Sequence, residues 1–494
     1  MSEIKYQSTR SKTENKTFAE AVIQGISPDG GLYVPTQFPK FDIHCSDFLA
    51  MSYPQLAESI FKPYMPELTT ATIKSNVNSA YDTKFSSDDI APLKTLGEGS
   101  FIELFHGKTQ AFKDMALSIL PYFMLTSIAH TKSEESVLIL TATSGDTGKA
   151  ALEGFADVSG IDIAVFYPTD GVSDIQKKQM TTQTGDNVHV FGINGNFDDA
   201  QTAVKTLFND EDLKALLGER GYRFSSANSI NIGRLLPQII YYFNSYKLLV
   251  KAGTIALGAP INICVPTGNF GNLLAAYYAM HMGLPVHQFI CASNQNHILT
   301  DFINTGIYDT NRAFHTTTSP SMDILISSNL ERLLYHLSGG DTEQIQQLMN
   351  GLKTSGRYEV SPMIKAKLDS FYGGYADEAK TQLEIKTTFT QDHYLIDPHT
   401  AVAYSVYKDY VKATGDHTHT LIAATASPYK FADSVLEALG HDATEGTPFD
   451  RIRKLSEITG TEIPKEIAAL ESAEVKHGGT IEKTEIRSTV AGLL

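Results

Sequence analysis

The sequence predicts an α/β protein with largely parallel sheets and more than one domain. An apolar strand, a glycine-bearing loop and a helix follow one another at 136–155 and again at 261–280, and this alternation is typical of parallel α/β units. The chain has 494 residues, whereas single cores stop growing at roughly 250–300. Hydrophobic residues make up 42% and charged residues 19%, as in an ordinary folded protein. Ligands are therefore expected at the carboxyl ends of the strands.

Changes in composition along the chain predict its divisions. Residues 1–90 combine helical signals with a turn at Asp29, Gly30 and Gly31, and they are expected to form an N-terminal lobe. The further divisions are an α/β core over 91–300, a helical insertion over 301–390, a return to the core over 391–440 and a C-terminal helical tail over 441–494.

Strands and helices are predicted from apolar runs and their boundaries. Strands are expected over 101–105, 136–140, 261–265, 380–388 and 420–424. Helices are expected over 115–128, 149–155, 232–250, 273–280, 341–368 and 397–410. Pro237 lies inside one of these helical segments, so a kink or a restart is expected there.

Charge and cysteine content exclude several classes of protein. The net charge of −16 disfavours nucleic-acid binding, so an anionic substrate would need a local cluster of cations or backbone amides. Three cysteines are too few and too far apart for a disulfide framework or a thiolate zinc site. No apolar run reaches the roughly 20 residues of a membrane span, and residues 1–10 lack the apolar region of a signal peptide. We expect a cytoplasmic protein without a metal, in which His417 and His419 belong to a strand edge.

Lys113 is the first candidate for a reactive residue. It lies where a strand is followed by the N-terminus of a helix, between Phe112 and Met115. Both the helix dipole and burial would lower the pKa of its amine towards that of a usable nucleophile. Taken alone, the simpler interpretation is a surface lysine that lies over its apolar neighbours.

Two glycine loops are candidate anion sites. Gly268, Asn269, Phe270, Gly271 and Asn272 precede a helix, whose backbone N–H groups would converge on a phosphate, although a tight turn would have the same pattern. The loop from Thr143 to Gly148 adds hydroxyl groups, and its glycine spacing does not match a nucleotide P-loop. Two phosphate-sized loops and a primed lysine suggest a pyridoxal phosphate enzyme.

Short motifs along the whole chain carry a family resemblance. They are Ser8-Thr9-Arg10, Pro28 to Leu32, Ala111 to Asp114, Thr143 to Gly148, Asn228 to Asn231 with Arg234, Pro266 to Asn272, Pro320 to Asp323, Ser327 to Asn329 and Asp397 to Ala401. In this order and spacing the chain resembles the threonine synthases of the longer bacterial and fungal type. That family belongs to the tryptophan-synthase-β-like group of pyridoxal phosphate enzymes, which implies two α/β lobes.

The resemblance also implies roles for particular residues. Lys113 would hold pyridoxal 5'-phosphate as a Schiff base, Thr425 would hydrogen-bond the pyridine nitrogen, and Asp146 would lie near the phenolic oxygen. The cofactor phosphate would lie on Gly268, Asn269, Phe270, Gly271 and Asn272. The substrate would be bound by Thr143, Ser144, Gly145, Thr147, Asn228, Ser229 and Arg234. The sequence departs from the family pattern at Lys108, Gln110 and Ser427.

The activity implied is the conversion of O-phospho-L-homoserine and water to L-threonine and phosphate. Lys113 would transfer the protons, and a mobile lobe at about 135–225 would close on the substrate. A related phospho-lyase that releases 2-oxobutyrate would share these motifs. A non-catalytic scaffold is the alternative from a different class, although nothing structural requires Lys113, both loops and Thr425 together. The protein is expected to be either a monomer or a homodimer.

Overall fold

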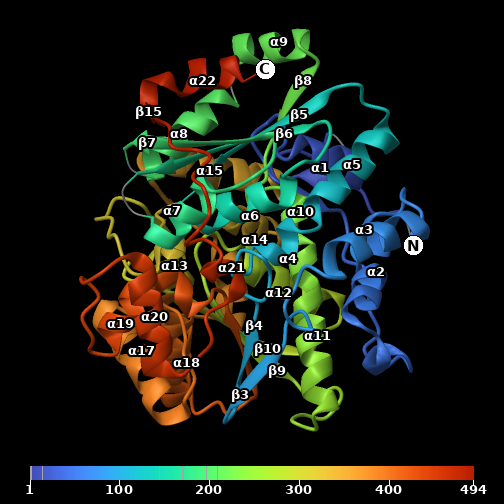
Figure 1. Ribbon diagram of the computed structural model, residues 1–494. Coiled ribbons are helices and arrows are strands. Elements are labelled where there is room, and N and C mark those ends of the chain that lie inside the picture. Colours follow the sequence, from blue (N-terminus) through green and yellow to red (C-terminus); the bar gives the residue numbers. More distant parts are fainter. Residues whose placement is uncertain are drawn as a thin grey trace.

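The fold confirms the predicted α/β class with mostly parallel sheets. The computed structural model describes residues 3–13, 15–143, 145–169, 172–195, 197–208 and 210–493. Two main sheets lie in separate lobes, one at the top of the view in Figure 1 and one at the bottom, with helices around them. Among the described residues, no helix is long and apolar enough to cross a membrane.

The larger sheet has six strands. In spatial order they are β13 (Phe371–Tyr375), β10 (Val286–Ser293), β9 (Ile261–Pro266), β14 (Thr420–Ala424), β4 (Gly99–Glu103) and β3 (Leu93–Leu96). Only the pairing of β3 with β4 is antiparallel. Every residue of β9 and of β14 is buried, as expected of central strands covered on both faces.

The smaller sheet has five parallel strands. In spatial order they are β15 (Thr480–Glu482), β7 (Val188–Asn194), β6 (Ile161–Pro168), β5 (Ser136–Ala142) and β8 (Tyr222–Ser225). The helices of this lobe are α6 (Asp146–Phe155), α7 (Asp174–Thr181), α8 (Phe197–Leu207) and α9 (Glu211–Glu219). A Cβ atom on Gly148 would lie 2.4 Å from the Thr143 methyl carbon, so glycine lets α6 begin close to the end of β5.

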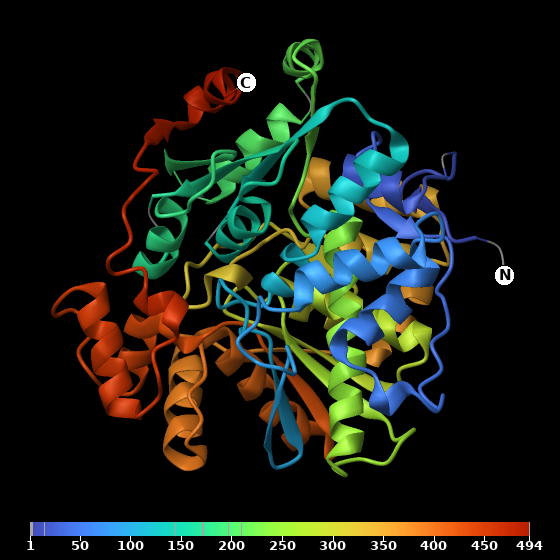
Figure 2. The ribbon, with the colours of Figure 1, turned by 45° about the vertical axis from the view of Figure 1, so that its right-hand side comes forward.

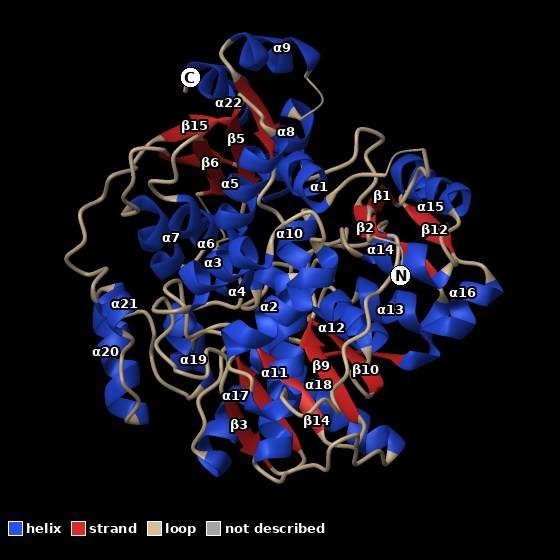
Figure 3. Cartoon of the chain, turned by 90° about the vertical axis from the view of Figure 1, so that its right-hand side faces the viewer, coloured by secondary structure: helices blue, strands red, loops and turns tan. Residues whose placement is uncertain are grey.

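The N-terminal elements pack beside both lobes (Figure 3). They are β1 (Tyr6–Ser8), α1 (Phe18–Gln24), β2 (Tyr33–Pro35), η1 (Phe48–Ala50), α2 (Tyr53–Tyr64) and α3 (Thr70–Tyr81). The predicted helix over 115–128 is divided into α4 (Asp114–Leu117) and α5 (Leu120–Thr131). The predicted restart at Pro237 is confirmed, since α10 (Ile232–Leu235) ends before it and α11 (Pro237–Lys251) begins there.

The region from 271 to 392 is mainly helical. Its helices are α12 (Gly271–Met282), α13 (Ile298–Thr305), η2 (Pro320–Met322), α14 (Leu330–Leu337), α15 (Thr342–Ser355), α16 (Pro362–Lys367), η3 (Leu368–Ser370) and α17 (Glu378–Asp392). The helix predicted over 341–368 is interrupted, because α15 ends at the left-handed Gly356 and β12 (Arg357–Glu359) pairs with β11 (Ile307–Asp309).

The strand predicted over 380–388 is wrong. This stretch belongs to α17, which is capped when the side chain of Asp377 accepts a hydrogen bond from the backbone of Lys380. Threonine and isoleucine favour strands in the absence of other contacts. Here the buried residues Thr381, Glu384, Ile385 and Thr388 recur at helical spacing, and packing against the next helix decides the structure.

The C-terminal part of the chain extends along both lobes, in red on one side of Figure 2. Its elements are α18 (Pro398–Thr414), η4 (Pro428–Phe431), α19 (Ala432–Ala438), α20 (Pro448–Thr459), α21 (Lys465–Ala468), η5 (Lys483–Glu485) and α22 (Ile486–Gly492). Within the predicted helical tail, β15 pairs with β7 of the five-stranded sheet. The division into domains stays a prediction.

Candidate active site

One pocket collects most of the predicted site residues. It lies at the carboxyl ends of β5, β9 and β14, where ligands bind in sheets of this kind. The predicted residues that line it are Lys113, Thr143, Asp146, Thr147, Asn228, Ser229, Arg234, Gly268, Asn269, Phe270, Gly271, Asn272 and Thr425. Gly145 is not among the lining residues, and Ser144 lies outside the described residues.

Lys113 lies at the start of α4 and is only 8% exposed. Burial lowers the pKa of its amine to about 8, and Arg234 and Lys430 act in the same direction, while Asp146 opposes them. The lowering agrees with the expectation from the sequence. Because α4 has only four residues, burial rather than a helix dipole is the main cause.

The loop before Lys113 is held in place from two sides. The Asp114 carboxylate accepts hydrogen bonds from the backbone N–H of Thr109 at 2.8 Å and from its hydroxyl at 2.6 Å. The backbone N–H of Phe112 donates to the carbonyl of Thr425 at 2.8 Å. The Lys113 loop is therefore fixed to the end of β14 by a backbone hydrogen bond. Lys113 and Thr425, which are expected at opposite ends of the cofactor, are held in place relative to each other by this bond.

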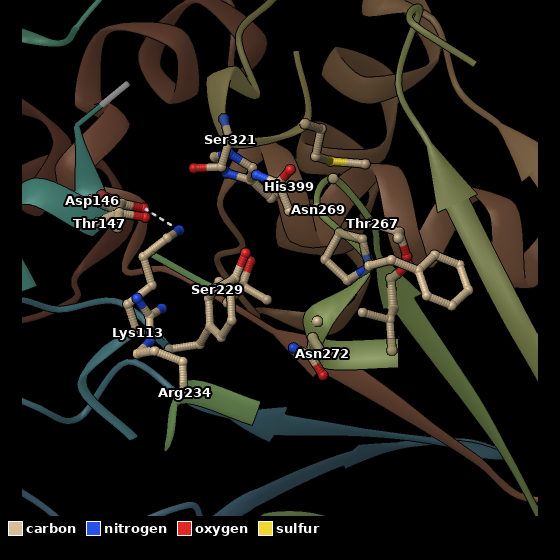
Figure 4. A pocket seen from close by; sticks show the side chains of 18 of the residues that line it. Lys113, Asp146, Thr147, Ser229, Arg234, Thr267, Asn269, Asn272, Ser321 and His399 are labelled. Carbon is tan, nitrogen blue, oxygen red and sulfur yellow. Dashed lines mark hydrogen bonds and ion pairs between the residues drawn. The ribbon is translucent and has the colours of Figure 1, made fainter. Parts of the chain in front are cut away.

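Asp146 lies between two lysines at the start of α6. Its Oδ2 atom is 3.9 Å from Lys113 Nζ, and its Oδ1 atom is 2.8 Å from Lys430 Nζ. The side-chain amide of Gln176 also donates to Oδ1 at 2.8 Å. Burial opposes ionisation, but Lys430 and Lys113 hold the pKa of Asp146 well below its usual range. Figure 4 shows Lys113 pointing towards Asp146, with Arg234 beside it.

The glycine loop after β9 has the backbone shape of an anion site. Phe270 adopts a left-handed conformation with φ of 62°, and α12 begins at the next residue. A Cβ atom on Gly268 would lie 2.4 Å from the carbonyl oxygen of Ser321, so only glycine fits. The first N–H groups of a helix have no partner within it, and those of α12 face the end of β9, where a phosphate would be stabilised.

The residues expected at the substrate phosphate come from the start of α10. Asn231 caps this helix by accepting a hydrogen bond from the backbone of Gly233 at 2.9 Å. Arg234 is buried, and burial lowers the pKa of its guanidinium to about 10. Its Nε atom and the side-chain oxygen of Asn228 are buried without a hydrogen-bond partner. Two orphaned polar atoms on residues that line one pocket fit a polar ligand there.

Several pocket residues were not predicted as site residues. They are Phe112, Ala142, Gln238, Val265, Pro266, Thr267, Ser321, Met322 and His399. His399 Nε2 accepts a hydrogen bond from the backbone of Ser321 at 3.2 Å, so its Nδ1–H donates to Asp397 at 2.6 Å. Ser321 and His399 lie in motifs that carried the resemblance, and that signal could have identified them.

The departures from the family pattern lie around the Lys113 loop. Gln110 has φ of 60°, and its side chain donates to the carbonyl of Gly107 at 3.0 Å. The backbone N–H of Ser427 donates to the carbonyl of Gln110 at 3.0 Å. The side chain of Lys108 is half exposed, and its Nζ atom lies 3.5 Å from Glu153.

Comparisons with known proteins agree with the family resemblance seen in the sequence. Three family models match: "Threonine synthase N terminus" over residues 5–81, "Pyridoxal-phosphate dependent enzyme" over 101–426 and "Threonine synthase, C-terminal" over 400–483. The threonine synthase of Pseudomonas aeruginosa is 35% identical, over 96% of this chain and 99% of that protein. The crystal structure of PLP-bound threonine synthase from Brucella melitensis has 34% identity and a TM-score of 0.86, and the match covers 99% of both chains.

A longer relative is also similar. Human threonine synthase-like 1 is 41% identical over 87% of this chain, and the chain spans 58% of the length of that relative. The fold and the central family model place the chain in the class of pyridoxal phosphate-dependent enzymes. Within that class, the chain belongs to the threonine synthase family.

Proposed function

We propose that this protein is a threonine synthase, which converts O-phospho-L-homoserine and water to L-threonine and phosphate. The observation that carries the proposal is one pocket that joins a buried lysine of lowered pKa to two candidate anion sites, the loop at 268–272 and the residues around Arg234. One anion site suits the phosphate of a cofactor, and the other suits a phosphorylated substrate. Full-length similarity to a threonine synthase supports the same reaction.

The residues present fit pyridoxal 5'-phosphate. Only glycine fits at position 268, and the buried side-chain nitrogen of Asn272 has no hydrogen-bond partner. Lys113 would hold the cofactor, residues 268–272 would bind its phosphate, and the hydroxyl of Thr425 would meet the ring nitrogen. When bound, pyridoxal phosphate supplies the electron sink that stabilises negative charge on the carbon atoms of the substrate.

The chain itself would supply proton transfer at Lys113. With a pKa of about 8, its Nζ atom can accept and return a proton near neutral pH. In the proposed reaction it first takes a proton from Cα. It then takes one from Cβ and donates one to Cγ. One base can serve three carbon atoms only if the substrate is held rigidly at both ends.

The two ends of the substrate meet different elements. Thr143 and Thr147, with Ser144 and Gly145 in the same loop, would bind the carboxylate. Asn228, Ser229 and Arg234 would bind the phosphate, for which a guanidinium is well suited. Because the first group lies on the five-stranded lobe, closure of that lobe would exclude water until the phosphate has left.

Product analysis tests this proposal. The purified protein should release L-threonine and phosphate in equal amounts from O-phospho-L-homoserine. Replacement Lys113→Met should abolish both, whereas Lys108→Met, in the same loop but half exposed, is the matched control and should retain them. Formation of 2-oxobutyrate instead of threonine would identify a phospho-lyase, and absence of phosphate release would favour a scaffold.

Location and assembly are also proposals. All three cysteines are free, and two of them, Cys264 and Cys291, are buried. Burial raises the pKa of the Cys264 and Cys291 thiols, so they are unreactive core residues. Free cysteines support a reducing compartment such as the cytoplasm. The expectation of a monomer or a homodimer stays a prediction.

A further inference from the structure

Lys430 is a buried lysine next to the pocket that the sequence analysis did not identify. It belongs to η4, five residues after Thr425, and its side chain is fully buried. Its Nζ atom lies 2.8 Å from Asp146 Oδ1 and donates to the carbonyl of Thr109 at 2.8 Å. A buried ammonium is costly unless it is paired, and here both partners belong to the surroundings of Lys113.

The same residue joins the two lobes. The carbonyl of Lys430 accepts a hydrogen bond from the hydroxyl of Ser173, the N-cap of α7, at 3.0 Å. Its ammonium meets Asp146 at the start of α6. Two helices of the five-stranded lobe are thus tied to a residue that follows a strand of the six-stranded sheet. Loss of one partner from a buried ion pair leaves an uncompensated charge, which is strongly destabilising.

The charges around Lys113 come from four elements. Asp146 belongs to α6, Arg234 to α10, Lys430 to η4 and Asp114 to α4. Asp146 is the strongest of these groups in favouring the ammonium form of Lys113, and Lys430 and Arg234 oppose it. Lys430 Nζ lies 2.8 Å from Asp146 and Lys113 Nζ lies 3.9 Å from it, so Lys430 is the closer and stronger ion-pair partner of this carboxylate.

We propose that Lys430 is a positioning residue that holds Asp146 and the lobe bearing α6 against the Lys113 loop, and so sets the charges that face the Lys113 amine. The inference deepens the proposed function, because it explains how a lysine beside a carboxylate can serve as a base. It does not depend on which product forms, since it concerns the protonation of Lys113 itself.

The test is the pH dependence of acetylation at Lys113. The full chain, freed of cofactor, is pulsed with acetic anhydride at a series of pH values, and mass spectrometry reports the labelling of each lysine. The Lys430→Met variant lacks the positive charge that opposes protonation of Lys113. In this variant Lys113 is also the only lysine left to pair with Asp146, and both changes raise the pKa of Lys113. The labelling midpoint should move up by roughly one pH unit or more, which slows labelling near neutral pH about tenfold.

Matched variants separate this role from a structural one. Lys247 is also buried, and its ammonium donates to the carbonyl of Met51 at 2.6 Å, remote from Asp146. Lys247→Met should therefore leave the Lys113 midpoint unchanged even if it lowers the unfolding temperature. Lys430→Arg should keep the midpoint near its original value, because it restores the charge. Lys430→Gln keeps a donor for Asp146 but should shift the midpoint as Lys430→Met does.

Two results would overturn the proposal. One is an unchanged Lys113 midpoint in both Lys430→Met and Lys430→Gln. The other concerns the unsubstituted chain, in which Lys430 should resist acetylation throughout the pH range where Lys113 reacts. Labelling of both lysines over the same pH range would show that Lys430 is not held as a buried, paired ammonium. With cofactor bound, the turnover of Lys430→Met should fall, and its pH optimum should become more alkaline.

Discussion

Gly268→Ala should weaken cofactor binding by a packing effect that the structure makes measurable. The added Cβ atom would lie 2.4 Å from the Ser321 carbonyl oxygen, whereas ordinary contacts begin at 3.4 Å. The phosphate loop and the turn at 320–322 would have to separate by about 1 Å, and overpacking of this kind costs about 1–3 kcal/mol. If that cost falls on the cofactor-bound state, the dissociation constant rises roughly 5- to 150-fold.

The assay is a titration of the cofactor-free protein with pyridoxal phosphate, followed by the visible absorbance of the lysine-linked cofactor. Gly218→Ala in α9 is the control, because a Cβ atom there meets nothing within 4 Å and alanine favours a helix. Its cofactor affinity should stay unchanged. Equal affinity in Gly268→Ala and the original protein would refute the close approach of Gly268 to Ser321 as a determinant of the site.

Three further predictions concern other parts of the pocket. Because the pKa of Lys113 is about 8, the rate of cofactor incorporation should rise about tenfold per pH unit below pH 8 and level off above it. Stopped-flow absorbance measures this rate, and a rate independent of pH would contradict the prediction. Arg234→Met should lower kcat/KM for the phosphorylated substrate roughly 10- to 100-fold and weaken inhibition by inorganic phosphate, and unchanged phosphate inhibition would place the substrate phosphate elsewhere. His399→Leu should leave the partly buried N–H of Ser321 without its acceptor. The cost in the free energy of unfolding, measured by denaturant titration, should be about 1 kcal/mol, and an unchanged midpoint would argue against that hydrogen bond.

The strand-to-loop units could be predicted because their information is local. The strand over 420–424 matches β14 at both ends, and that over 261–265 differs from β9 by one residue. Each is an apolar run that ends at a residue able to turn the chain, and burial of such runs dominates over other tendencies. The glycine loop at 268–272 stands out by its residue types as a turn or a candidate anion site, and this signal is also local.

The misassigned segments depended on contacts that are distant in sequence. The segment at 380–388 has residues that favour strands, but packing of α17 against α18 makes it helical. β13 and β15 are short, and each exists through pairing with a strand far away in the chain, β10 and β7 respectively. No periodicity within three to five residues can indicate such a partner.

The sequence by itself determined the class of fold and the family resemblance, because both depend on residue types in short motifs, and through that resemblance it predicted roles for Lys113 and the loop at 268–272. Only the tertiary structure decided the electrostatics of the site. It placed Lys430 against Asp146, 284 positions away, and so balanced the charges around Lys113. Charges act through space rather than along the chain, so the protonation of one lysine depends on residues that only folding brings together.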